Sequence, residues 1–210
     1  MLHVEHDLAI RRVFSAAGVS APESFVLASA RHLDAMYRAN RQISLTAVPE
    51  ADAAELLVFD AVAPILAVKK PTAFLDIGSG AGFPGLILAL WWQNVSASLV
   101  ESHRKRASFL EIATTSIGPT VEILNLRVEE LILSQQTWPF VTSRATFPPD
   151  KLIEVVLPLI SIGGSALFYM SRRGAAEAEE IMRLFSNISA NRIDYSLPTH
   201  GPRSALLIDT

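Results

Sequence analysis

Apolar side chains in the N-terminal third of the chain recur every three or four residues, the spacing that places them on one face of a helix. The repeat is visible at Phe25, Ala28, His32, Leu33 and Met36, and again at Leu56, Phe59, Ala63 and Leu66. Pro22 suits the first turn of one helix, and Pro49 separates that helix, with its Arg41–Val48 tail, from the next. We therefore predict a small helical N-terminal cap over residues 1–70 and a core over residues 71–210.

From residue 72 onward, short apolar runs alternate with helical patterns. The predicted strands are Ala73–Ile77, Ala97–Glu101, Thr120–Asn125, Phe140–Arg144, Gly164–Tyr169, Arg192–Ser196 and Ser204–Ile208, and the predicted helices lie at about 83–92, 104–117, 127–134, 149–158 and 174–187. Repeating strand–helix units predict a parallel sheet with helices on both faces. The link Leu197–Pro202 is too short for a helix, so the last two strands should form an antiparallel hairpin. The expected fold class is α/β with a mixed sheet.

Composition supports a globular protein without disulfide chemistry. Of the 210 residues, 50% are hydrophobic and 19% charged, which is enough to bury a core. The absence of cysteine excludes disulfides and thiolate ligands and fits a reducing compartment, so we expect a cytoplasmic protein. The first seven residues are too charged for a signal peptide. The apolar stretch Val155–Met170 is interrupted by Pro158 and Gly163-Gly164 and is too short for a membrane span, so no membrane association is expected.

The stretch Pro71–Gly85 carries the strongest chemical signal. An apolar run ends at Asp76, glycines then alternate with small residues, and the apolar segment Leu86–Trp92 follows. This order of strand, tight turn and helix is typical of sites where backbone N–H groups face a nucleotide-like cofactor. Glycines allow the positive φ of the turn and a close approach of the ligand.

Two cofactors are compatible with this turn. Gly80-x-Gly82-x-x-Gly85 matches the dinucleotide fingerprint, which favours NAD. Asp76 opposes it, because a carboxylate beside a pyrophosphate would repel it, whereas the sulfonium and ammonium groups of S-adenosylmethionine would gain from the acid. Glu101, at the end of the second predicted strand, can accept hydrogen bonds from ribose hydroxyls of either cofactor. We favour S-adenosylmethionine, while a helix cap for Asp76 and a solvated strand end for Glu101 are the structural alternatives.

The motifs resemble those of the bacterial 16S ribosomal RNA guanine-N7 methyltransferases, the RsmG or GidB family. The resemblance runs from about residue 25 to the end and is carried by Phe74–Gly85, Glu101–Arg106 with Phe109-Leu110, Arg127–Glu130, Ser143–Ala145 and the segment Asn40–Thr46. It implies a Rossmann-like seven-stranded methyltransferase core behind the helical cap, with S-adenosylmethionine as cofactor. The implied substrate is a guanine in the 530 loop of 16S ribosomal RNA, free or in a small-subunit particle.

Site residues follow from the motifs and from the resemblance together. The candidates for cofactor binding are Asp76, Gly78, Gly80, Gly82, Phe83, Glu101, Val128, Glu129 and Arg144. Arg144 is also the candidate catalytic residue, because it ends the fourth predicted strand, at the sheet edge where α/β folds place ligands. Guanine N7 has a free lone pair, so the reaction needs alignment of N7 with the methyl group and no general base.

Basic residues near the site are candidates for RNA binding. Arg104, Lys105 and Arg106 begin the predicted helix after Glu101, where cations oppose the helix dipole unless a phosphate compensates for them. Arg41, Arg172 and Arg173 are further candidates, and a solvated surface is the alternative for each. The histidines show no metal-ligand spacing supported by acids, so we expect no metal. We expect a monomer.

Some family positions differ in this chain. The family's His-x-x-Asp-Ser stretch is Leu57-Val58-Phe59-Asp60-Ala61 here, its tryptophan before Asn40 is Ala39, and its lysine-glycine pair after the fifth strand is Arg172-Arg173-Gly174. We interpret these as outer, RNA-facing positions. They leave open a methyltransferase that acts on another RNA or on a small molecule.

Overall fold

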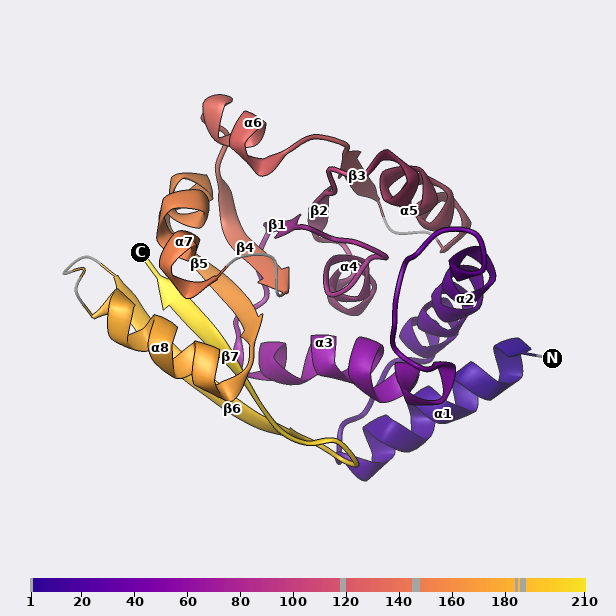
Figure 1. Ribbon diagram of the computed structural model, residues 1–210. Coiled ribbons are helices and arrows are strands. Elements are labelled where there is room, and N and C mark those ends of the chain that lie inside the picture. Colours follow the sequence, from indigo (N-terminus) through magenta and orange to yellow (C-terminus); the bar gives the residue numbers. More distant parts are fainter. Residues whose placement is uncertain (1, 118–119, 145–147, 184, 186–187) are drawn as a thin grey trace.

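A seven-stranded sheet forms the centre of the computed structural model, which describes residues 2–117, 120–144, 148–183, 185 and 188–210 (Figure 1). The strands are β1 (Ala73–Ile77), β2 (Ser96–Val100), β3 (Val121–Leu124), β4 (Trp138–Arg144), β5 (Ile160–Met170), β6 (Ser189–Leu197) and β7 (Gly201–Asp209). Their order is β3-β2-β1-β4-β5-β7-β6. β7 runs antiparallel to both β5 and β6, whereas the other pairs are parallel. The predicted mixed sheet and the C-terminal hairpin are therefore confirmed.

Helices cover both faces of this sheet. They are α1 (Leu2–Ala16), α2 (Glu23–Asn40), η1 (Glu50–Asp52), η2 (Ala54–Phe59), α3 (Asp60–Val62), η3 (Ala63–Ala67), α4 (Gly85–Trp92), α5 (Arg104–Ile117), α6 (Val128–Leu133), α7 (Pro149–Val156), η4 (Leu157–Leu159) and α8 (Arg172–Met182). Apolar side chains of α6, α7 and α8 pack on one face, and those of α4 and α5 pack on the other. Within the described part of the chain, no helix has both the length and the hydrophobicity needed to span a membrane.

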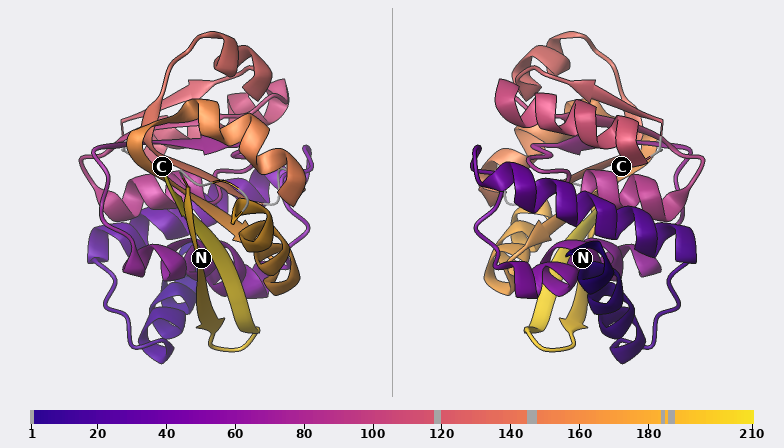
Figure 2. Two further views of the ribbon diagram at one scale, coloured as in Figure 1. Left: turned by 90° about the vertical axis from the view of Figure 1, so that its left-hand side faces the viewer. Right: turned by 90° about the vertical axis from the view of Figure 1, so that its right-hand side faces the viewer.

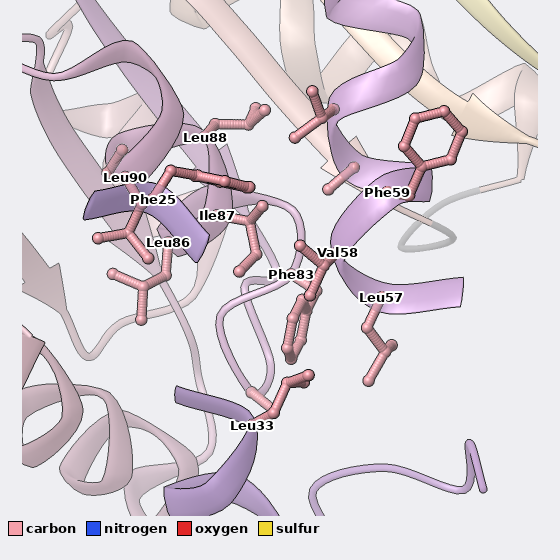
Figure 3. Packing of buried hydrophobic residues seen from close by; sticks show 14 of the residues in the cluster. Phe25, Leu33, Leu57, Val58, Phe59, Phe83, Leu86, Ile87, Leu88 and Leu90 are labelled. Atoms are coloured by element: carbon pink, nitrogen blue, oxygen red, sulfur yellow. The ribbon is translucent and has the colours of Figure 1, made fainter. Parts of the chain in front are cut away.

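The N-terminal helices lie over α4 and share its core. One cluster of buried side chains joins Phe14 and Phe25 of the cap to Phe74 of β1 and Leu86 of α4. Figure 3 shows the cap residues Phe25, Leu33 and Val58 in one buried cluster with Phe83 of the glycine turn and the apolar side chains of α4. Because α4 is enclosed by the cap on one side and the sheet on the other, it is apolar around its whole circumference. The division into a cap and a core stays a prediction, although the two parts are joined by this common interior.

The hairpin of β6 and β7 extends toward the cap (Figure 2). Its turn is held there by an acid of the cap. Glu55 of η2 accepts hydrogen bonds from the backbone N–H groups of Thr199 and His200, at 2.7 and 2.9 Å. The Thr199 hydroxyl adds a third bond at 2.6 Å. Burial alone would raise the pKa of Glu55, but these bonds outweigh it and hold the pKa at about 2. The cap and the C-terminal hairpin are thus linked through a buried carboxylate.

Several element boundaries differ from those expected. β1 has the predicted bounds, but β5 begins at Ile160, before the glycine pair at 163–164, because it pairs with β4 on both sides of a register shift at which Gly163 has a φ of 73°. The third strand begins after Thr120. The last helix begins at Arg172 because the Ser171 side chain caps it by accepting the Gly174 N–H. That helix ends at Met182, and its predicted continuation to 187 lies partly outside the described residues.

The cap also departs from the predicted regular helices. Pro22 precedes the first turn of α2 instead of lying within it. The third helical segment contains a π-helical stretch, η2, in which the Asp60 N–H donates to the Glu55 carbonyl, five residues back. Such stretches are rare and are often found at functional sites.

Candidate functional site

The glycine turn after β1 has the backbone geometry that its sequence predicts. Gly78, Gly80 and Gly82 have φ values of 72°, 58° and 97°. The N–H groups of Gly78 and Ser79 both donate to the Val100 carbonyl at 2.9 Å, which ties the turn to the end of β2. A Cβ on Gly82 would lie 3.0 Å from both His32 and Leu86. Gly82 therefore serves close packing against the cap, whereas Gly78 faces the cavity described below.

Asp76 lies beneath this turn and is fully buried. Its Oδ2 accepts the N–H of Gly85, the first residue of α4, at 3.1 Å, and Oδ1 has no hydrogen-bond partner among the residues that the structure describes. Burial raises the pKa of Asp76 to about 7. A side chain on Gly85 would collide with Asp76 and Leu99, so the acid and the glycine require each other. The structure shows the helix-capping contact of Asp76, and a contact with a cofactor stays a prediction.

Glu101 lies just after the end of β2 and is also buried. Its Oε2 accepts the Gly80 N–H at 2.9 Å, and its Oε1 accepts the His103 N–H at 2.7 Å. The acid and the glycine turn predicted from the sequence are therefore in direct contact. His103 Nδ1 also lies 3.0 Å from Oε1, so Oε2 is the oxygen that keeps a further lone pair with which it could accept a hydroxyl.

A cavity of about 170 Å³ opens beside the turn, at the carboxyl edge of the sheet. It is lined by Ile77, Gly78, Val100, Ser102, Leu126, Arg127, Val128 and Glu129. The predicted residues Gly78, Val128 and Glu129 are thus brought together, although they come from different strand–helix connections. The mixture of aliphatic walls with backbone and carboxylate groups suits a flat heterocycle with polar edges. Ser102, Leu126 and Arg127 are not among the predicted site residues, although Ser102 and Arg127 lie in segments that resemble the family. Single residues of these types in loops carry no distinctive pattern.

Arg144 and Phe83 lie at the end of β4 and in the glycine turn, against the cap. The Arg144 guanidinium lies 5.7 Å from the centre of the Phe83 ring, within the range of a cation–π contact. Its Nη1 donates to the Leu56 carbonyl at 3.2 Å and lies 3.8 Å from Oδ2 of Asp60. The side chain of Arg144 is 23% exposed, so the guanidinium is held by the cap but still reached by solvent.

His32 of α2 holds the glycine turn from the cap side. Its Nε2 lies 2.7 Å from the Ala81 carbonyl, and its ring contacts those of Phe83 and Phe109. Burial lowers the pKa of His32 to about 4, so the neutral ring donates from Nε2. The sequence placed His32 on the apolar face of its helix, but a contact to a turn 49 residues away leaves no local signal.

The basic candidates fall into two groups. Arg104 and Lys105 are exposed at the start of α5, and Arg106 donates from Nε and Nη2 to the Ser44 carbonyl at 3.3 and 3.2 Å. Arg41 lies at the end of α2 and lines a surface pocket of about 250 Å³. Through Arg106 and the Ser44 carbonyl, the start of α5 contacts the chain that follows α2. Arg41 and the three cations of α5 therefore come from neighbouring parts of the structure.

The second basic group lies on α8. Arg172 and Arg173 are both exposed in its first turn. Arg173 forms an ion pair with Glu177 at 2.7 Å. Arg104–Arg106 follow β2 and Arg172 and Arg173 follow β5, both at the carboxyl edge of the sheet, whereas Arg41 follows α2. RNA binding stays a prediction for all of them.

The positions that differ from the family motifs are not all on the outer surface. Leu57 and Ala61 are buried in the cap, with exposed fractions of 3% and 0%. The expectation that they face RNA is therefore wrong, because both belong to the core beneath the cap. Ala39 is half-buried, and the neighbouring Asn40 holds the loop through the N–H groups of Leu45 and Thr46.

The acids and histidines of the described residues are dispersed rather than gathered into a metal site. Within the described ranges, no group of three or more of these side chains converges on a point where it could hold a metal ion.

Solved structures define the class of this fold. An O-methyltransferase from Klebsiella pneumoniae matches 100% of the chain with a TM-score of 0.68 at 12% identity. An O-methyltransferase from Bacillus cereus in complex with S-adenosylhomocysteine covers 99% of the chain at a TM-score of 0.67 and 12% identity, and 99% of that protein is matched. The chain therefore has the Rossmann-like fold of the S-adenosylmethionine-dependent methyltransferases, and the predicted fold class is confirmed.

Family models and curated relatives identify the family. The model described as GidB, rRNA small subunit methyltransferase G, matches residues 28–202, and the chain belongs to this family. The ribosomal RNA small subunit methyltransferase G of Zymomonas mobilis is 36% identical over 67% of the chain, and that of Dehalococcoides mccartyi is 37% identical over the same share. The chain spans 61% of the length of both proteins. The protein of the same name from Streptococcus gordonii is 28% identical over 85% of the chain and 80% of its own length.

Proposed function

We propose that this chain transfers a methyl group from S-adenosylmethionine to N7 of a guanine in the 530 loop of 16S ribosomal RNA. The match to the rRNA small subunit methyltransferase G family over residues 28–202 carries the proposal. The curated relatives bear the same description, which names the small-subunit RNA as their substrate. The acceptor, as free RNA or in a small-subunit particle, and a cytoplasmic site of action are part of this proposal.

The residues around the glycine turn fit the cofactor. The cavity between Gly78 and the Val128-Glu129 pair would hold the adenine ring, and Glu101 beside it would accept the ribose hydroxyls. The aliphatic walls of Val100 and Leu126 suit the two faces of a purine. S-Adenosylmethionine would supply an electrophilic methyl group on sulfur.

The proposed mechanism requires the chain to align guanine N7 with the methyl group and to exclude water. Guanine N7 attacks through its own lone pair, so no side chain has to remove a proton, and the structure accordingly needs no general base at the acceptor. Phe83 and Arg144, which meet at the border between turn and cap, lie where the acceptor base would approach the carboxyl edge. Positive charge passes from sulfur to the purine, so fixed carboxylates and carbonyls near the site favour the transfer.

The proposed RNA surface is formed by exposed cations beside the cavity. Arg104 and Lys105 are exposed at the start of α5, shortly after Glu101, whose carboxylate holds the glycine turn, and Arg41 is exposed at the end of α2. With a net charge of −3, the chain needs such a local basic surface to attract RNA phosphates. N7 lies in the deep and narrow major groove of A-form RNA, which favours a loop as target.

Two measurements test the proposal. The first is the melting temperature with S-adenosylhomocysteine and with NADH, where the former should stabilise the fold and the latter should not. The second is mass spectrometry of 7-methylguanosine after incubation of the protein and S-adenosylmethionine with unmethylated 16S RNA or small subunits. Binding of S-adenosylhomocysteine without 7-methylguanosine in either substrate would overturn the acceptor and favour another RNA or a small molecule. Stabilisation by NADH alone would overturn the cofactor.

A further inference from the structure

The cap reaches the candidate catalytic arginine through its π-helical stretch. Arg144 lies 3.8 Å from the carboxylate of Asp60, and its Nη1 donates to the carbonyl of Leu56. Both acceptors belong to the helical segment that contains η2, where the backbone hydrogen bond from Asp60 spans five residues. A carboxylate and a carbonyl from one short helical segment therefore both contact the guanidinium that lies over the Phe83 ring.

The carboxylate of Asp60 is itself oriented from the far end of the chain. The Tyr195 hydroxyl, on β6, donates to its Oδ1 at 2.8 Å. Oδ2 is therefore the oxygen that faces Arg144. Next to this contact the Tyr169 hydroxyl of β5 donates to the Ala61 carbonyl at 2.5 Å, which holds the same segment on the sheet.

The burial of these groups makes the arrangement specific. The Asp60 side chain is only 13% exposed, and burial raises its pKa despite the hydrogen bond from Tyr195. Burial also raises the pKa of Tyr195, with the charge of Asp60 as a further cause, so its hydroxyl remains a donor. Removal of one partner costs more stabilising free energy in a partly desolvated ion pair than in an exposed pair.

We propose that Asp60 and Tyr195 are positioning residues that set the orientation of the Arg144 guanidinium at the site of methyl transfer. The inference rests on the proposed function, because it assigns the two residues to the same site. It adds that the cap and the C-terminal hairpin complete the site together: Asp60 comes from one and Tyr195 from the other.

Glu55 provides a matched control. It is also a buried acid of η2, and it also accepts hydrogen bonds from the C-terminal hairpin, at Thr199 and His200. No contact between Glu55 and Arg144 is present among the described interactions. Glu55→Gln therefore weakens the junction of cap and hairpin without touching the arginine.

The kinetic test compares Asp60→Asn and Tyr195→Phe with Glu55→Gln in methyl transfer to 16S RNA. We expect kcat to fall about tenfold or more in Asp60→Asn, and less in Tyr195→Phe, because misplacement of an aligning group slows transfer steeply. Glu55→Gln should lower the melting temperature but leave kcat within about twofold, since it does not touch the site. In an Arg144→Lys background, Asp60→Asn should have little further effect. If Asp60→Asn lowered kcat in the Arg144→Lys background by the same factor as in the wild type, the proposal would be overturned.

A second readout does not depend on activity. The ¹⁵N–¹H signals of the Arg144 guanidinium, assigned by their loss in Arg144→Lys, report whether the group is held. They should shift and broaden in Asp60→Asn and Tyr195→Phe but not in Glu55→Gln, and unchanged signals in the first two variants would overturn the proposal. If the wild type neither binds S-adenosylhomocysteine nor methylates RNA, the proposed function fails. The positioning of Arg144 by Asp60 is then still decided by these signals.

Discussion

The imidazole Nε2 of His32 lies 2.7 Å from the carbonyl oxygen of Ala81, so α2 of the cap is joined directly to the glycine turn. The ring is fully buried between Phe83 and Phe109, and no partner for its Nδ1 is present in the described part of the molecule. A charged imidazole would be poorly accommodated in these surroundings, and burial accordingly lowers the pKa of His32 to about 4. The contact predicts a specific dependence of stability on pH.

The pKa of His32 is lower in the folded than in the unfolded chain. The contribution of the neutral ring to the free energy of unfolding is therefore complete above about pH 6.5 and is lost as pH falls toward about 4. We expect His32→Gln, which keeps a side-chain donor, to remove this loss. The free energy of unfolding of the wild type should fall relative to the variant by up to about 1.36 kcal/mol per pH unit in this window. Urea unfolding at a series of pH values measures the difference. Parallel curves for the two proteins would contradict the prediction.

Asp76 should show the opposite dependence. Its pKa is raised from 3.8 to about 7 by burial, so its contribution to stability is complete below about pH 3.8 and is lost as pH rises through 7. Asp76→Asn keeps an acceptor for the Gly85 N–H and removes the titration. We expect the variant to gain stability relative to the wild type as pH rises from about 4 to 7. A difference in unfolding free energy that does not change with pH would contradict this.

The same variant separates the two interpretations of Asp76. If the acid only caps α4, Asp76→Asn should bind S-adenosylhomocysteine with wild-type affinity at pH 8, because the asparagine still accepts the hydrogen bond of the Gly85 N–H. If its charge attracts the cofactor, the affinity should fall by about tenfold or less, as expected for one partly screened charge. Isothermal titration calorimetry decides between them. We expect the affinity to stay at the wild-type value, because Asp76 is fully buried beneath the turn.

The cavity beside Gly78 predicts a steric effect on cofactor binding. Ser102 is exposed and lines the cavity, so Ser102→Trp should fill it without disturbing buried residues. We expect the affinity for S-adenosylhomocysteine to fall by about tenfold or more, which removes about 1.4 kcal/mol of binding free energy. Ser108→Trp, at an exposed position of α5 outside the cavity, is the control. Equal affinities of the two variants would show that the cofactor binds elsewhere.

The sequence predicted the local parts of the site well. Asp76, the glycine turn and Glu101 belong to two neighbouring parallel strands, and the carboxyl ends of such strands meet at one edge. The contact between Gly80 and Glu101 is therefore a consequence of strand order that short motifs reveal. Cofactor contacts of these residues remain predictions, since the hydrogen bonds seen are those within the chain.

Contacts between distant segments could not be predicted in the same way. Tyr195 and Asp60 are 135 residues apart, and neither residue stands out by type or spacing. Helical periodicity in the cap did not reveal the π-helical stretch, and the apolar face expected around it is only partly correct: Phe59 is buried, but Leu66 is 49% exposed. Leu57 and Ala61 are expected at the surface only because they differ from the family motif, and a difference from a motif does not reveal burial, since the cap encloses both.

The exposed cations at the start of α5 predict a salt-dependent loss of RNA binding. The double variant Arg104→Ala, Lys105→Ala removes two charges beside the cavity, whereas Lys69→Ala, Lys70→Ala removes two exposed charges before β1, at the opposite edge of the sheet. We expect the first variant to bind a 16S RNA fragment more weakly and to lower the slope of log K against log salt concentration by about 0.7 per lost phosphate contact. The second should leave both quantities unchanged, since the amino edge of the sheet lies away from the site. Filter binding at several salt concentrations measures both. Equal slopes in the two double variants would remove α5 from the RNA surface and leave Arg172 and Arg173 of α8 as its remaining candidates on the carboxyl edge.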